Sequence, residues 1–512
     1  MNHQTSSDSN AYAGASLIAG AASEGGPDTF HAVNPAGQHS IEPAFVEADS
    51  NDVARAAEAA HVAFQVFRQT SPGTRARLLR TIADGIAELG DELFERARLE
   101  TGLPLARFKG ESLRTQGQLK MFASHLESGD AETLNNEAAE PERTPLPKPA
   151  IRHQKIPMGP VAVFGASNFP LAFSTAGGDT ASALAAGCCV VVKGHPAHPG
   201  TSELVAGAIY RALDECDLPA GIFSLIQSSH NDIAAELVRH PAIQAVAFTG
   251  SLQGGRAMMD IAAARPDPIP VFAEMGSINP VFLLPDALAE RGEDLARGFA
   301  QSVTLGEGQF CTNPGLAIGI AGAAMTRFVE TTAQVLEQHQ PGPMLTSGIH
   351  QAFMAGSRAL ADTEQVIAVS QPADSSPGSA KGRLFQTSAQ VFLNHPRLYD
   401  EVFGPATLVV ICADDQEMQA VAESLAGQLT ATLLVNETDR EQALALLPAL
   451  EQRAGRIVFN GYPTGVEVCH GMVHGGPWPA SSNSNSTSVG IGALQRFQRP
   501  ICYQDLPAGW MD

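Results

Sequence analysis

The sequence is short of positive charge: it has 32 Lys and Arg against 54 Asp and Glu, for a formal net charge of −22. Binding to nucleic acid or to an anionic membrane depends on clustered Lys and Arg, so we expect neither partner. No stretch stays apolar for the length of a membrane-spanning helix, and the N-terminal segment lacks the basic and apolar regions of a secretion signal. We therefore expect a soluble, cytoplasmic protein.

Cysteine is also sparse. The seven cysteines are an odd number spread over 512 residues, unlike the dense, even pattern of a disulfide-stabilised secreted domain. We expect reduced thiols. Cys188 and Cys189 lie in a strand-like apolar run, which predicts core positions for both.

The overall amino-acid composition is that of an ordinary globular protein with large hydrophobic cores. Hydrophobic residues make up 44% of the chain and charged residues 17%, while 48 glycines indicate many turns. A chain of 512 residues is too long for one compact core, so the length indicates two to four domains.

The first half of the chain predicts helices followed by alternating strands and helices. The segment up to about Pro35 is rich in small and polar residues and predicts a loose arm or short edge strands. Residues 51–127 carry apolar side chains every three to four positions, as amphipathic helices do. The polar, proline-containing residues 132–149 predict a linker. From residue 157 to 276, apolar strands alternate with helices, which predicts a parallel, doubly wound α/β sheet.

The second half predicts another α/β domain. From about Ser277 the alternation resumes through VFLLP, the helix TRFVETTAQVLEQH and the strands QVIAVS, ATLVVICA and GRIVF. The final segment is polar, contains prolines and is only weakly periodic. We expect it to wrap over another surface or subunit.

The most specific chemical feature is Cys311 in GEGQFCTNP, between glycines and small polar residues. A lone cysteine is more often a core residue than a nucleophile. A thiolate nucleophile needs access and nearby donors that lower its pKa, and turn amides or a helix terminus would supply both. Cys311 is therefore a candidate nucleophile whose assignment depends on its neighbours.

Two polar residues follow predicted strands and provide that context. Glu274 ends the strand in VFAEMGS, where open α/β sheets place their ligands, and partial burial there would raise its pKa toward that of a general base. Asn168 follows the strand in GASNFP, and its amide would donate to a developing oxyanion. In isolation, Glu274 is equally explained as a solvated strand end, and Asn168 is more often simply a turn residue.

The order of Asn168, VVKGHP, FTGS, Glu274, Cys311 and EVFGP resembles the aldehyde dehydrogenase superfamily along nearly the whole chain. The resemblance implies that Cys311 attacks the aldehyde and that Asn168 and the Cys311 amide hold the oxyanion. It further implies that Glu274 activates the water that hydrolyses the thioester. Retention of all three residues argues against a non-catalytic scaffold, and Glu274 argues against transfer of the acyl group to coenzyme A.

The same resemblance implies a set of cofactor-binding positions. FTGSLQGGR joins a strand end, a small-residue turn and a helix start, which is how backbone amides approach a pyrophosphate. Phe164 and Lys193 are expected near the adenosine end. Gly250 and Ser251 are expected near the pyrophosphate, and Glu401 and Phe403 near the nicotinamide riboside.

The segment KGHPAHPG favours NADP, with NAD still possible. In members that prefer NAD, the resemblance would place a Glu where this chain has Pro196. The missing carboxylate removes repulsion against a 2′-phosphate, and Lys193 with His195 would add positive charge. His198 is expected to be a solvent-exposed turn residue.

Within the superfamily, the C-terminal segment from GYPTGVEVCHG onward is similar to the ketoglutaric semialdehyde (2,5-dioxopentanoate) dehydrogenase branch. GASNFPLAFSTAGGD is similar to that branch and to a bacterial NADP-dependent fatty aldehyde dehydrogenase. The expected reaction is therefore oxidation of 2,5-dioxopentanoate to 2-oxoglutarate, with a medium- or long-chain fatty aldehyde as the alternative substrate.

The resemblance also implies the domain plan. We expect a dinucleotide-binding domain from residues 1–149 and 159–276, a catalytic domain from 277–474, and an oligomerisation element from 150–158 and 475–512. A homodimer or homotetramer is expected. His470 and His474 have the spacing of a helical metal pair, but the glycines around them argue against a rigid helix, and we expect no metal.

Overall fold

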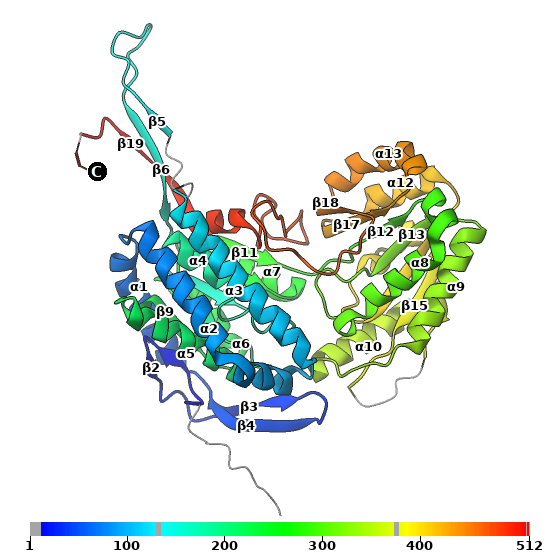
Figure 1. The fold of residues 1–512 in the computed structure, drawn as a ribbon, viewed down its shortest axis with the longest axis horizontal. Helices are drawn as coiled ribbons and strands as arrows, with labels where there is room; N and C mark the ends of the chain where they lie inside the picture. The colour runs from blue at the N-terminus through cyan, green and yellow to red at the C-terminus, as the bar shows by residue number, and fades with distance from the viewer. Residues whose placement is uncertain (1–11, 130–134, 373–377, 508, 511–512) are drawn as a thin grey trace, which may run out of the picture.

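The computed structural model describes residues 12–129, 135–372, 378–507 and 509–510. It has two lobes side by side, each built on a seven-stranded sheet, and an arm that projects from the first lobe (Figure 1). The predicted class, a doubly wound cofactor-type domain plus a second α/β domain, is confirmed. Among the described residues, no helix is both long and apolar enough to cross a membrane.

The first sheet has the strand order β11-β10-β7-β8-β9-β1-β2. Its five long strands are parallel, and β1 pairs antiparallel with β9 and β2 at the edge. Its strands are β1 (Leu17–Ile18), β2 (Ala21–Ala22), β7 (Val161–Phe164), β8 (Val190–Lys193), β9 (Phe223–Ile226), β10 (Ala245–Thr249) and β11 (Val271–Glu274). The short edge strands β1 and β2 confirm that part of the N-terminal prediction. Residues 1–11 lie outside the described residues.

Helices cover both faces of this sheet because its strands are apolar on both sides. The predicted amphipathic block forms α1 (Ser50–Phe67), α2 (Pro72–Thr101) and α3 (Leu105–Glu127). The crossover helices are α4 (Gly178–Ala186), α5 (Pro199–Glu215), α6 (Asn231–Arg239) and α7 (Leu252–Ala263). Cys188 and Cys189 are buried in this core, as predicted.

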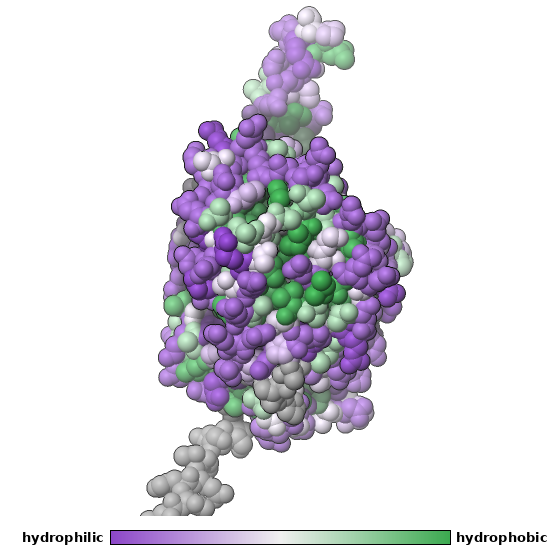
Figure 2. Space-filling model, turned by 90° about the vertical axis from the view of Figure 1, so that its right-hand side faces the viewer, coloured by the Kyte–Doolittle hydropathy of each residue, from purple (hydrophilic) through white to green (hydrophobic). Residues whose placement is uncertain are grey.

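The second sheet has the order β14-β15-β16-β13-β12-β17-β18 and is parallel except for β14. Its strands are β12 (Val281–Leu283), β13 (Leu316–Ile320), β14 (Ile367–Ser370), β15 (Arg383–Ser388), β16 (Ala406–Cys412), β17 (Gln428–Leu434) and β18 (Ala454–Phe459). Its helices are α8 (Pro285–Thr304), α9 (Ala323–Gln338), α10 (Ser347–Ala361), α11 (Ala389–Asn394), α12 (Asp415–Ser424) and α13 (Arg440–Glu451). Figure 2 looks at the outer face of this lobe and shows apolar residues gathered within a mostly polar surface.

The arm is a three-stranded antiparallel sheet in the order β19-β6-β5. Its strands are β5 (Asn135–Glu137), β6 (Ile151–Pro157) and β19 (Gln498–Gln504). Part of the stretch predicted as a linker therefore forms strand β5, because β6 offers it an unpaired edge. The projecting end of the arm is mainly hydrophilic (Figure 2). Its role in forming a homodimer or homotetramer stays a prediction.

The C-terminal segment joins the two lobes. The Met275 amide donates to the Ala480 carbonyl and the Ser482 amide to the Ala273 carbonyl, at the edge of the first sheet. In the second lobe, the Gly427 amide donates to the Trp478 carbonyl. A small hairpin of β3 (Thr29–Asn34) and β4 (His39–Val46) lies at the base of the first lobe (Figure 1). Residues far apart in sequence therefore meet between the lobes.

Candidate active site

The site begins at the switch point of the first sheet. The chain runs outward from β7 to β8 and β9, then returns to add β10 on the other side of β7. The loops that leave β7 and β10 therefore diverge and open a crevice at the carboxyl ends of these strands, where α/β sheets bind ligands. Asn168 follows β7, Gly250 and Ser251 follow β10, and Glu274 ends the neighbouring β11. The fold thus brings these predicted residues to one edge.

Cys311 reaches this edge from the second lobe through a sharply bent loop. Gly306, Glu307 and Gly308 all have left-handed backbone conformations in a short 3₁₀ turn (Leu305–Gly308) after α8. A Cβ on Gly308 would overlap the Gly404 backbone, so only glycine fits there. The loop can therefore pass close against the neighbouring chain and present Cys311 to the first lobe.

Asn279 holds the Cys311 loop in place through hydrogen bonds to its backbone. It is fully buried, and its Nδ2 lies 2.8 Å from the Cys311 carbonyl oxygen and 2.9 Å from that of Asn313. Thr430 Oγ1 donates to Asn279 Oδ1 over 2.9 Å and sets the direction of the amide. Sequence reasoning overlooked Asn279, although it lies in the same FAEMGSINP motif as Glu274.

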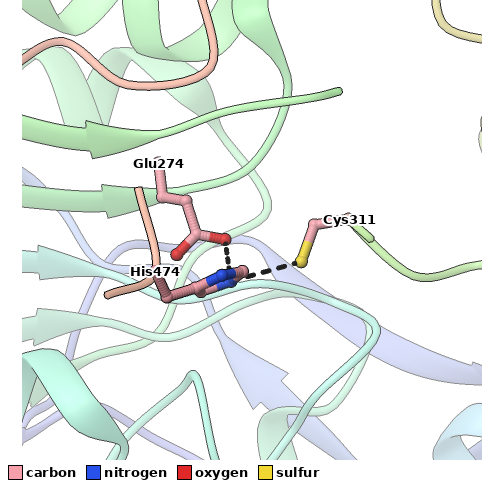
Figure 3. A group of neighbouring side chains, drawn as sticks. All are labelled: Glu274, Cys311 and His474. Atoms are coloured by element: carbon pink, nitrogen blue, oxygen red, sulfur yellow. Dashed lines mark hydrogen bonds and ion pairs between the residues drawn. The ribbon is translucent and has the colours of Figure 1, made fainter. Parts of the chain in front are cut away.

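Glu274, His474 and Cys311 form a compact cluster (Figure 3). His474 Nε2 lies 2.9 Å from Glu274 Oε1 and 3.6 Å from Cys311 Sγ, so the imidazole stands between carboxylate and sulfur. Ser488 Oγ donates to the other Glu274 oxygen. His474 is 1% exposed and Glu274 is 5% exposed, whereas Cys311 is partly accessible. A thiol, a base and an acid are therefore within proton-transfer reach.

His474 is the residue that sequence reasoning misplaced. As expected, it does not pair with His470, which is exposed and whose ring lies 6.4 Å from that of His125; the unexpected feature is that His474 is buried beside Glu274. The His474 amide donates to Thr487 Oγ1 over 2.8 Å, which holds this irregular segment in place. Nothing in VCHGMVHGG signals the contact, because Cys311 is 163 residues away.

The electrostatics of Glu274 differ from the expectation. Burial alone would raise its pKa, as predicted, but the His474 charge and the hydrogen bonds from His474 and Ser488 together outweigh burial, and the pKa is lowered. The prediction of a raised pKa is therefore wrong for this state. Glu274 is ionised at neutral pH and is ready to accept a proton.

The Cys311 thiol also departs from the expectation. Burial, and next the neighbouring Glu274 charge, raise its pKa well above the usual range, while the Arg114 charge opposes them weakly. The expected lowering by turn amides is not found. Cys311 is therefore a protonated thiol before substrate binds, and its activation requires a proton acceptor.

Asn168 is held close to the cysteine loop. Its Nδ2 donates to the carbonyl of Gln309, two residues before Cys311, over 2.9 Å. Arg107 fixes the loop, since its Nη2 donates to the Asn168 carbonyl over 3.0 Å and its guanidinium lies over the rings of Phe169 and Phe310. The carboxamide carries a second N–H, which is available to an oxyanion.

A pocket of about 430 Å³ leads to Cys311. Helix α3 forms one wall of the pocket, aromatic side chains form a second, and the loop at Gly465 and Val466 forms a third. Its lining residues include Arg107, Arg114, Phe169, Phe173, Phe310, Cys311, Gly465, Val466 and His474. Both apolar and cationic groups therefore face a substrate that approaches the thiol.

The predicted adenosine and pyrophosphate positions lie at adjacent strand ends. Phe164 and Lys193 are register partners at the ends of β7 and β8. Lys193 Nζ donates to the Ser228 carbonyl, and burial lowers the Lys193 pKa to about 8. Ser251 caps α7 by accepting from the Gly254 amide over 3.1 Å, and Gly250 precedes it. A strand end followed by a capped helix N-terminus fits a pyrophosphate.

Two histidines after β8 differ from the expectation. Burial, followed by the His198 and Lys193 charges, lowers the His195 pKa well below its usual range. His195 is therefore neutral and offers hydrogen bonds, not the charge that the sequence predicted. His198 is fully buried, with Nε2 3.1 Å from the Ala166 carbonyl oxygen. Its expected exposure is wrong because it packs beneath the loop that carries Asn168.

The predicted nicotinamide positions lie between the lobes. Glu401 and Phe403 line a second pocket with Ser277, Phe310 and Asn313. A Cβ on Gly276 would overlap the Glu401 carboxylate, so glycine admits that carboxylate beside the end of β11. A carboxylate and an aromatic ring beside the cysteine loop fit a ribose and a nicotinamide. The residues present therefore suit a dinucleotide along the whole edge.

Glu274, Cys311 and His474 each offer a metal-ligand atom, and these atoms lie within 4.8 Å of one another. Carboxylate, thiolate and imidazole are the ligands that zinc prefers. An ion on Cys311 Sγ would compete with an aldehyde for the sulfur. The expectation that the reaction uses no metal stays a prediction.

Comparison with known proteins identifies the family. The aldehyde dehydrogenase family model matches residues 22–497. Alpha-ketoglutaric semialdehyde dehydrogenase 2 of Azospirillum brasilense is 52% identical over 96% of this chain and 94% of its own. Alpha-ketoglutaric semialdehyde dehydrogenase of Acinetobacter baylyi is 47% identical over 93% of this chain and 91% of its own.

Solved structures agree in fold. Betaine aldehyde dehydrogenase of Staphylococcus aureus superposes with a TM-score of 0.82 at 21% identity and covers 98% of each chain. Salicylaldehyde dehydrogenase of Pseudomonas putida G7 gives a TM-score of 0.82 at 20% identity, over 96% of this chain and 98% of its own. Because the family model spans nearly the whole sequence and two relatives are 47% and 52% identical to it, the chain belongs to the aldehyde dehydrogenase family and is an aldehyde-oxidising oxidoreductase.

Proposed function

We propose that the chain oxidises 2,5-dioxopentanoate, the semialdehyde of 2-oxoglutarate, to 2-oxoglutarate with NADP as the hydride acceptor. The observation that carries the substrate assignment is the 52% and 47% identity to two α-ketoglutaric semialdehyde dehydrogenases over more than nine-tenths of the chain. The thiol, acid and amide described above supply the chemistry of aldehyde oxidation.

In the proposed mechanism, Cys311 is the nucleophile. Its proton passes to the Glu274–His474 pair, through the nitrogen that lies 3.6 Å from Sγ, and the thiolate adds to the aldehyde carbon. The Cys311 amide and Asn168 Nδ2 donate to the resulting oxyanion. A nicotinamide held beside Glu401 and Phe403 would supply the hydride acceptor, and loss of hydride from the adduct carbon would leave a thioester on Cys311.

Hydrolysis of the thioester is assigned to Glu274. Once the thiol proton has passed from the pair to solvent, the ionised carboxylate takes a proton from water and the hydroxide adds to the thioester carbon. The carbon–sulfur bond then breaks to release the carboxylic acid, and the proton held by Glu274 passes to the departing thiolate. Ser488 and His474 hold the carboxylate at the pocket edge through its two oxygens. Each turnover therefore returns the protonated thiol.

A substrate panel tests this function. With purified protein and NADP, we expect 2,5-dioxopentanoate to be oxidised with a kcat/KM at least ~10-fold above that of a medium-chain aldehyde. The reason is that a hydrogen bond between a cationic side chain and the substrate carboxylate contributes ~1.5–3 kcal/mol of binding free energy. Absorbance of the reduced nicotinamide measures both. A preference for the medium-chain aldehyde would instead assign fatty aldehyde oxidation, and no reduction with any aldehyde would contradict the catalytic proposal.

The cofactor assignment predicts the effect of a charge at Pro196. A carboxylate in Pro196→Glu would repel a 2′-phosphate held near Lys193, so we expect the kcat/KM for NADP to fall at least ~10-fold, with that for NAD unchanged or raised. Pro196→Gln is the matched neutral control and should change the NADP to NAD ratio far less. An equal effect of both variants, or a wild-type enzyme that prefers NAD, would refute the assignment.

A further inference from the structure

Two arginines on α3 face the substrate pocket. Arg107 and Arg114 are seven residues apart, about two helical turns, so they lie on the same side of the helix. Both line the pocket that leads to Cys311. They differ in what their guanidinium groups bind.

Arg107 is fully engaged with the protein. It donates to the Asn168 carbonyl, lies over the Phe169 and Phe310 rings, and approaches Glu111 Oε2 at 3.5 Å. Glu111 in turn accepts from the amides of Leu171 and Ala172. Arg107 therefore stabilises the loop that carries Asn168.

Arg114 has no comparable set of partners. Its Nη1 is buried and has no hydrogen-bond partner among the described residues. Its guanidinium carbon lies 5.1 Å from the centre of the Phe173 ring, so the guanidinium packs against an aromatic side chain that offers Nη1 no hydrogen-bond acceptor in its plane. A buried charged nitrogen without a partner is costly, and proteins retain one where a ligand pairs with it.

Arg114 and the thiol line the same pocket, so a short substrate with two functional ends would meet both. The Phe173 ring, against which Arg114 packs, lies 6.1 Å from the His474 ring, and His474 contacts Cys311. Arg114 is close enough that its charge acts on the Cys311 pKa. The two ends of 2,5-dioxopentanoate are separated by four carbon–carbon bonds, or about 5 Å.

We propose that Arg114 binds the carboxylate of the substrate and so selects short aldehydes that carry an acid at the far end. A guanidinium presents paired N–H donors that match a carboxylate, and the Phe173 face keeps the fork in its plane. The net charge of −22 repels an anionic substrate, so a local cation is required to retain one. This inference rests on the proposed function and adds the residue that binds the substrate carboxylate.

The test compares 2,5-dioxopentanoate with pentanal, which has the same chain length and no charge. In Arg114→Leu we expect the KM for 2,5-dioxopentanoate to rise about 30-fold or more, while kcat/KM for pentanal changes less than about 3-fold. Arg114→Lys should restore part of the loss because it restores the charge but not the fork. Competitive inhibition by 2-oxoglutarate should weaken in parallel.

Arg107→Leu is the matched control. Because Arg107 braces the Asn168 loop, its loss should lower kcat for both aldehydes alike. Equal losses for both aldehydes in Arg114→Leu would overturn the proposal and leave Arg114 a structural residue or a modulator of Cys311. Failure of the wild type to oxidise 2,5-dioxopentanoate would instead refute the proposed function. Thermal unfolding of each variant verifies that it is folded.

Discussion

Replacing Cys311 with alanine should abolish aldehyde oxidation, with kcat lowered by roughly 10⁴-fold or more, because no other group can form the thioester. Among the described residues within reach of the site, Glu274 and His474 can move protons but cannot replace the sulfur. Reduced nicotinamide formed in the steady state and in a single turnover measures the loss. Substantial oxidation by the variant would refute the assigned nucleophile.

Cys502 provides the matched control for this prediction. It is an exposed thiol on β19 of the arm, away from the pocket, and Cys502→Ala should keep wild-type activity. Since burial and Glu274 raise the pKa of Cys311, its thiolate fraction is small at neutral pH and grows as the pH rises. Inactivation of the wild type by iodoacetamide should therefore accelerate from pH 7 toward pH 9.

Replacing Glu274 with glutamine should separate the two half-reactions. We expect a rapid burst of reduced nicotinamide equal to the active-site concentration, followed by steady turnover about 10²-fold or more below the wild type. The amide accepts hydrogen bonds but cannot take a proton from water, so the thioester accumulates on Cys311. Stopped-flow absorbance resolves the burst, and mass spectrometry of the quenched protein detects the acyl group.

The outcomes of the Glu274→Gln experiment distinguish two roles. Normal steady turnover would contradict the assigned general base. A variant without a burst would place Glu274 before hydride transfer, as the acceptor of the thiol proton, which the contact through His474 makes possible. Cys311→Ala should show no burst and sets the baseline.

His474 changes how the site is understood. Carboxylate, imidazole and thiol form a continuous contact, so the proton of a high-pKa thiol has a direct acceptor. The same contact contributes to the lowered pKa of Glu274, since the His474 charge and the hydrogen bonds to Glu274 together outweigh burial. Proton transfer and water activation thus share one buried acid in the proposed mechanism.

Much of the architecture could be predicted from local pattern. Apolar strands that alternate with helices predict a parallel sheet. Asn168, Gly250 and Glu274 each lie at or just after the carboxyl end of such a strand, so they lie at the same edge of the sheet. The loop GEGQFCTNP made Cys311 a candidate nucleophile, and the order of the motifs around it identified it. These features depend on residues close together in the chain.

Other features depend on contacts across the fold. The burial of His198 follows from a carbonyl of Ala166, 32 residues away, and strand β5 exists because β6 offers it an edge. Arg107 is engaged because the Asn168 carbonyl, 61 residues away in sequence, lies within hydrogen-bond reach of it. No periodicity or motif encodes such pairings.

The sequence by itself determined the two α/β lobes, because strand periodicity and turn chemistry are local properties. The family and the candidate nucleophile, acid and amide followed from the resemblance of its motif order to a known superfamily. Only the tertiary structure decided the protonation states of Cys311 and Glu274, the neutral His195, the place of His474 and the Arg114 Nη1 that has no partner among the described residues. A pKa and a hydrogen-bond deficit are set by burial and by charges within a few ångströms, and those neighbours come from distant parts of the chain.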